Sequence, residues 1–98
     1  MNITLEKIPQ PKGRKLQQYL VKRGAETLGL VEKMGPYPGE VHPWKAFAAG
    51  VEKTTGQQCA GAHYLGATYT DKHQAALMVR NHKDNTEAIK LQDALKFI

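Results

Sequence analysis

The stretch AHYLGATYTDKHQAALMV, residues 62–79, decides the fold of this chain. Up to Tyr69, side chains of different character alternate with the two-residue period of a strand. Thr70 is a favoured helix N-cap and Asp71 is an acid suited to a first helical turn. Small and apolar residues then recur at helical spacing: Ala75, Ala76 and Val79. We therefore expect a strand to end at Tyr69 and a helix to begin at Thr70.

Two further strands are predicted before this stretch. Residues 44–53 alternate, with Phe47 and Val51 on the expected core face and small residues opposite, beyond Trp44. The polar, Gly-containing residues 54–61 would join strands 44–53 and 62–69 into an antiparallel hairpin. Residues 25–34 are predicted as a strand. A helix there would also place Leu28 and Val31 on one side, but Gly24 and Gly29 weaken a helix.

The two ends of the chain are expected to be an arm and helices. Residues 1–12 read as a Pro-containing arm, with a short strand at residues 3–8 as the alternative. Residues 13–23 read as a helix with Leu16, Tyr19 and Leu20 on one face and Gly24 as its stop. The helix after Thr70 is expected to end near Asp84, with Asn85 or Thr86 capping a last helix that reaches Ile98.

The predicted fold is therefore α+β, a single three-stranded antiparallel sheet packed on helices, with an N-terminal helix. Residues 13–98 would form one domain after the arm, which suits a chain of 98 residues. Residues 35–43 carry two glycines and three prolines, so we expect a loop there. One face of such a sheet would be open to solvent or to a partner.

Composition excludes several classes of protein. No apolar run is long enough to cross a bilayer, and the N-terminus lacks the apolar region of a secretory signal, so we expect a cytoplasmic protein. The single cysteine, Cys59, cannot form an intramolecular disulfide. The four histidines are not clustered at ligand spacing, so no metal or cofactor is expected. No nucleophile motif, paired acids or phosphate-binding glycine loop is present, so the chain is not expected to be an enzyme.

The excess of positive over negative charge lies at the start of the chain. The net charge is +5, and residues 1–23 hold six basic residues against Glu6 alone, whereas the rest of the chain balances. A basic segment of this kind is a common electrostatic footprint for a phosphate backbone. The alternative is a solvated tail that binds nothing.

Part of the chain resembles the ethylene-response-factor type of DNA-binding domain. The phrase Tyr64-Leu65-Gly66, then Tyr69-Thr70 and Ala75-Ala76, is similar to the third strand and helix of that family, with Thr68 as one extra residue. Phe47-Ala48-Ala49 and Val51 resemble its second strand. The resemblance covers roughly residues 27–82. It implies a three-stranded sheet lying in the major groove, although Ala62 and His63 stand where the family carries an arginine.

The first half of the chain is similar to the double-stranded-RNA-binding domain. The residues that carry this resemblance are Leu16-Gln17-Gln18-Tyr19, Lys22-Arg23-Gly24, Gly35-Pro36 and His42 before Phe47. That family grips phosphates with a lysine cluster at the start of its last helix. Here the cluster is reduced to Lys72 between Asp71 and His73.

These observations favour a small basic protein that binds duplex nucleic acid, more readily DNA than RNA, through the sheet and the arm. The candidate contact residues are Lys12, Arg14, Lys15, Lys22, Arg23, Trp44, Lys45, Lys53, Tyr64 and Lys72. Trp44 could instead close the edge of the core. The rival interpretation is a protein-binding module of phage or mobile-element type, or a homodimer, that uses the open sheet face or helix 86–98. Its anchors would be Trp44, Tyr64 and Tyr37.

Overall fold

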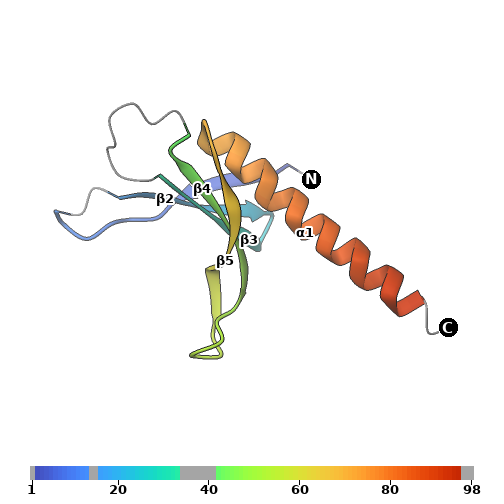
Figure 1. Ribbon diagram of the computed structural model, residues 1–98. Helices are drawn as coiled ribbons and strands as arrows, with labels where there is room; N and C mark the ends of the chain where they lie inside the picture. The colour runs from blue at the N-terminus through green and yellow to red at the C-terminus, as the bar shows by residue number, and fades with distance from the viewer. Residues whose placement is uncertain (1, 14–15, 34–41, 96–98) are drawn as a thin grey trace.

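Five strands and one helix make up the described part of the chain. The computed structural model describes residues 2–13, 16–33 and 42–95. The elements in chain order are β1 (Thr4–Lys7), β2 (Gln17–Arg23), β3 (Glu26–Lys33), β4 (Trp44–Val51), β5 (Gln58–Tyr69) and α1 (Lys72–Leu95). The strands form one antiparallel meander in the order β1-β2-β3-β4-β5, and α1 lies against one face of it (Figure 1).

This architecture corrects the predicted three-stranded sheet with an N-terminal helix. Residues 17–23 of the expected helix form β2, paired on both sides by β1 and β3. The helical stripe drawn through Leu16, Tyr19 and Leu20 omitted Val21, whose side chain is fully buried in the strand. Gly24, expected to stop a helix, has a φ of +63° and turns the chain from β2 into β3.

The N-terminal segment also joins the sheet. β1 is an edge strand whose Leu5 pairs with Val21, so the alternative of a short strand within residues 3–8 is the one observed. Within residues 25–34, β3 confirms the predicted strand, and β4 and β5 confirm the predicted hairpin, with β5 starting earlier than expected at Gln58. Residues 34–41, which include most of the predicted loop and Tyr37, lie outside the described residues.

The two faces of β4 are the reverse of those predicted. Trp44, Ala46 and Ala48 are buried on the side that α1 covers. Phe47 lies on the opposite face, and Val51 is 48% exposed. Ala46 and Ala48 let the helix approach this face of the strand closely, and Trp44 fills the space at its end against Tyr19.

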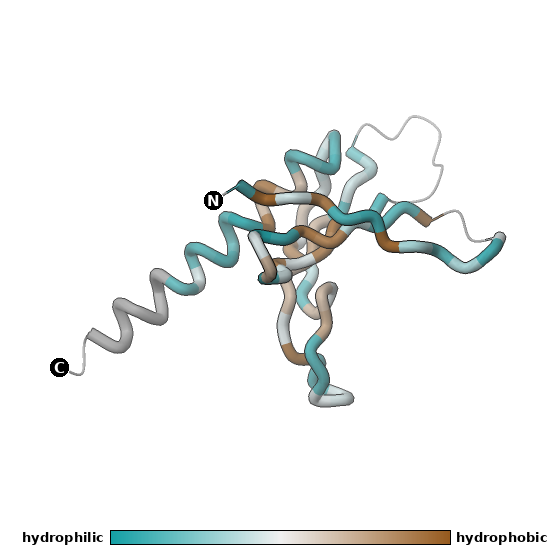
Figure 2. Tube along the Cα trace, turned by 180° about the vertical axis from the view of Figure 1, so that it is seen from behind, coloured by the Kyte–Doolittle hydropathy of each residue, from teal (hydrophilic) through white to brown (hydrophobic). Residues whose placement is uncertain are grey.

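The core forms where α1 crosses the middle of the sheet. Ala75, Ala76 and Val79 are fully buried against Val21, Leu28 and Val31. Gly29 marks the closest approach, because a Cβ atom there would overlap the carbonyl oxygen of Phe47 and lie 2.6 Å from Cγ1 of Val79. Figure 2 shows the coloured part of the helix just beyond the sheet as hydrophilic, and the buried helix residues that the structure describes lie in the first turns of α1.

The helix begins and ends differently from the prediction. Asp71 Oδ1 accepts a hydrogen bond from Gln74 N at 2.8 Å, and Gln74 Oε1 accepts from Thr70 N and Thr70 Oγ1. Asp71 is therefore the cap, one residue later than expected. The expected break after Asp84 is absent, since α1 is continuous to Leu95. Thr86 Oγ1 donates a hydrogen bond to the carbonyl oxygen of His82 at 2.8 Å, one turn earlier in the same helix. Thr86 is therefore an internal helix residue and not an N-cap.

Gly29→Ala is expected to lower the free energy of unfolding by about 1–3 kcal/mol, because the added methyl group overlaps the backbone carbonyl oxygen of Phe47 and overpacks the contact with Val79. Urea unfolding followed by circular dichroism measures this. Gly61→Ala is the matched control on the open face. There the nearest atom to an added Cβ is Leu30 Cδ2 at 3.1 Å, the end of a flexible side chain. Equal unfolding midpoints for the two variants would contradict this account of the core.

Candidate functional site

Two of the residues predicted to contact phosphate, Lys22 and Arg23, form ion pairs with carboxylates of this chain. Lys22 Nζ lies 3.1 Å from Glu6 Oε2. Arg23 forms an ion pair with Asp84 of α1 at 2.9 Å and a longer one with Glu26 at 3.7 Å. The hydrogen bond to Asp84 raises the pKa of the Arg23 guanidinium above its ordinary value. These two side chains are therefore committed to holding the strands and α1 together.

Three other lysines lie beside the Tyr19 and Trp44 ring pair on the helix-covered face of the sheet. Lys72 Nζ lies 4.4 Å from the centre of the Tyr19 ring. Lys7 is the cross-strand partner of Tyr19, and Lys33 is the partner of Trp44, whose ring centre is 6.0 Å from that of Tyr19. We call Lys7, Lys33 and Lys72 the lysine cluster. Among the residues that the structure describes, none of the three forms an ion pair.

The lysine cluster lies at one end of the sheet, which we call the basic end. β1 and β3 end there, β2 and β4 begin there, and α1 starts beside it. The connection between β1 and β2 continues beyond the sheet at this end, supported by a hydrogen bond from Ile8 N to Gln18 O at 2.9 Å (Figure 1). That connection carries Lys12, which is exposed. Arg14 and Lys15 lie outside the described residues.

The opposite face of the sheet bears two rows of side chains across four strands. We call Leu20, Leu30, Phe47 and Tyr64 the apolar row, since each is the cross-strand partner of the next. The neighbouring positions Gln18, Glu32, Lys45 and Thr68 pair in the same way and form the polar row. In the described part of the chain no helix covers these rows, so we call this surface the open face.

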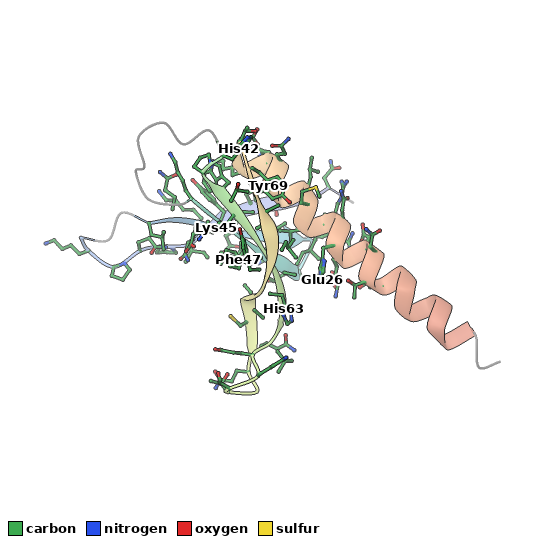
Figure 3. All side chains as sticks on the ribbon, in the orientation of Figure 1. Glu26, His42, Lys45, Phe47, His63 and Tyr69 are labelled. Atoms are coloured by element: carbon green, nitrogen blue, oxygen red, sulfur yellow. The ribbon has the colours of Figure 1, made fainter. Side chains whose placement is uncertain are left out.

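The centre of the open face is aromatic. The ring centres of Phe47 and Tyr64 are 5.4 Å apart, and Lys45 Nζ lies 5.9 Å from the centre of the Tyr64 ring. Tyr64 is 50% exposed. Gln18 Nε2 donates to Glu32 Oε1 at 2.8 Å. Figure 3 shows Lys45 and Phe47 along β4 on the side away from α1. The arrangement is an apolar centre with a polar margin, the anatomy of a binding surface.

The structure thus divides the predicted contact residues between separate surfaces. Lys45 and Tyr64 meet on the open face, whereas Trp44 and Lys72 both contact Tyr19 on the covered face. Lys53 lies in the connection from β4 to β5, at the far end from the lysine cluster. Sequence reasoning missed Lys7 and Lys33 and placed Phe47 in the core. Only strand pairing shows that Lys7 lies beside Tyr19 and Lys33 beside Trp44.

Other parts of the molecule offer less chemistry. An open hollow of about 250 Å³ lies against the connection from β4 to β5, lined by Val51, Glu52, Lys53, Thr54, Ala62 and His63. Its carboxylate, Glu52, accepts hydrogen bonds from Thr54 and Thr55 and so shapes the turn. In the described ranges, no three His, Cys, Asp or Glu side chains come together as metal ligands would, and no helix is both long and apolar enough for a bilayer.

Comparison with protein-family models, with curated proteins and with solved structures found no match to this chain. The resemblances to two nucleic-acid-binding families therefore stay predictions.

The two aromatic residues predicted as contacts should differ sharply in their effect on stability. Trp44 is 7% exposed, so Trp44→Ala is expected to cost about 3–5 kcal/mol of unfolding free energy. Tyr64→Ala is expected to cost about 1 kcal/mol, because that ring is half exposed and loses mainly its contact with Phe47. Thermal and urea unfolding of both variants provide the comparison. Similar losses of unfolding free energy in the two variants would show that Trp44 does not contribute to the core more than Tyr64 does.

Proposed function

We propose that this protein binds nucleic acid, with duplex DNA as its preferred form, through phosphate contacts made by the lysine cluster and Lys12. The observation that carries the proposal is the lack of any carboxylate partner for Lys7, Lys33 and Lys72 among the described residues. Ammonium groups in this state are available to replace the counterions of a phosphate backbone. The cytoplasm stays the proposed location, because the lone cysteine suits a reducing compartment.

The distribution of charge along the sheet supports the basic end as the contact surface. At the opposite end, Lys22 and Arg23 are neutralised by Glu6, Glu26 and Asp84. At the basic end, Asp71 is occupied as the helix cap and Glu32 is bonded to Gln18 on the other face. The protein is therefore electrostatically polarised, and a duplex approaching the basic end meets lysines with few competing carboxylates.

The proposed contacts position the protein and read little sequence. Lysines bind phosphates as point charges, whereas base discrimination usually needs bidentate side chains directed at base edges. Strong salt dependence and weak sequence preference are therefore expected. The resemblance to a major-groove sheet supports duplex DNA as the first ligand to test, but the apolar row does not offer the donors that such reading requires.

The experiment is a salt titration of binding to a short labelled DNA duplex, followed by fluorescence anisotropy. The variant Lys7→Gln, Lys33→Gln, Lys72→Gln removes the lysine cluster. Each lost phosphate contact is expected to lower the slope of log affinity against log salt by about 0.9, so the triple variant should lose roughly 2.7. Duplex RNA of the same length serves as the comparison ligand. Circular dichroism verifies that the variant keeps its helix and sheet.

The matched control is Lys22→Gln, Lys53→Gln, Lys83→Gln, which removes the same charge away from the basic end. Its slope should stay within about one contact of the wild type, since Lys22 and Lys83 already have carboxylate partners. Equal losses in the two triple variants would show that total charge, and not the lysine cluster, drives binding. Absence of wild-type binding to duplex DNA at low salt overturns the proposal.

A further inference from the structure

The open face is an uncovered apolar surface on a small, extended molecule. The radius of gyration is 15.0 Å, above the about 13 Å expected of a compact domain of this length. Among the described residues α1 packs on one side of the sheet and no helix covers the apolar row on the other side, where Leu20, Leu30 and Phe47 are half-buried and Tyr64 is 50% exposed. A half-exposed tyrosine, Tyr64, beside Phe47 at the centre of such a face favours burial against a partner.

The charges of the open face indicate what kind of partner fits. Glu6 and Lys22 pair with each other at its edge. Glu32 and Lys45 sit side by side in the polar row, yet within the described residues neither forms an ion pair. The face is therefore neutral on a chain whose net charge is +5. A phosphate backbone would meet the carboxylate of Glu32 in the polar row, whereas a second copy would meet no net repulsion.

The register of the sheet makes this face self-complementary. We propose that two copies pack through their open faces about a two-fold axis that runs parallel to the strands, between β3 and β4. Such an axis places β3 of one copy over β4 of the other. Because Glu32 is the cross-strand partner of Lys45, the axis sets Glu32 of each copy opposite Lys45 of the other.

The same operation matches the apolar row with itself. Leu30 of one copy would lie opposite Phe47 of the other, and Leu20 opposite Tyr64, since each pair occupies equivalent positions about the axis. Sheets that pack face to face keep their strands aligned within about 30°. The facing residues on β3 and β4 lie nearest the axis, so an angle of this size between the two sheets leaves them in contact.

The dimer is expected to be weak and dependent on concentration. Four strands spaced about 4.8 Å apart and about 25 Å long make a face of roughly 500 Å². A standard interface buries about 800 Å² on each partner. Sedimentation velocity of the full chain over a micromolar concentration series should therefore show a reversible monomer–dimer equilibrium, and a monomer at every concentration overturns the proposal.

Opposite charge reversals test the symmetry itself. Glu32→Lys should weaken the dimer by about tenfold or more, because a lysine would then face Lys45 of the other copy. Lys45→Glu should do the same by placing a glutamate opposite Glu32. Mixing the two variants should restore dimerisation to near the wild-type level, because both facing positions then carry opposite charges. Each variant keeps a positive net charge, since one reversal changes the wild-type +5 by two units.

Controls separate this interface from folding and from general electrostatics. Lys53→Glu makes the same charge change as Lys45→Glu at the exposed connection between β4 and β5, and should leave dimerisation unchanged. Circular dichroism confirms that each single variant is folded. If the folded single variants dimerise as the wild type does, or if mixing them restores nothing, the two-fold arrangement is wrong. This inference does not rest on nucleic-acid binding, which is measured separately on the lysine cluster.

Discussion

The close contact between α1 and β3 is the constraint on which the rest of the structure depends. Gly29 leaves room for Val79, and the small residues Ala75 and Ala76 complete a helix surface that can lie close to the sheet. Dispersion and apolar burial at this contact require small side chains on both partners. The positions of the sheet directly beneath the helix are therefore small, at Gly29, Ala46 and Ala48, and the larger side chains of the covered face, such as Trp44 and Tyr19, pack beside it.

The ion pair of Arg23 with Asp84 orients the charges as well as the helix. It joins β2 to a residue 61 positions later in the chain. Together with the pairs of Arg23 with Glu26 and of Lys22 with Glu6, it neutralises the basic side chains at the end of the sheet away from the lysine cluster. Among the described residues, Lys7, Lys12, Lys33 and Lys72 thus lie at the basic end without an ion pair, whereas Lys53 and Arg80 also lack one but lie away from it. A two-fold axis parallel to the strands would place both basic ends on the same side of a dimer, which doubles the surface offered to a phosphate backbone.

The prediction succeeded where local signals were consistent and failed where one signal suits two structures. Alternation and turn residues identified β4, β5 and their hairpin. The extra Thr68 lies at a β-bulge, where β5 has more residues than the facing part of β4, and Gly66 of that bulge has a φ of +82°. Residues 17–23 were wrongly predicted as helix because Leu16, Tyr19 and Leu20 fit a helical period, whereas the strand places Tyr19 on the covered face and Leu20 on the open face. Gly24 with positive φ can end a helix or turn a hairpin, and only pairing with β1 and β3 decides between them.

The sequence by itself determined the strand-to-helix order of residues 62–79, the hairpin before it and the excess of positive charge in the first quarter of the chain. Those properties depend on neighbouring residues and on composition. The tertiary structure decided which face of β4 is buried, which lysines have carboxylate partners and which aromatic residue remains exposed. Packing and ion pairing join residues far apart in the chain, such as Gly29 with Val79 and Arg23 with Asp84, so no local pattern could reveal them.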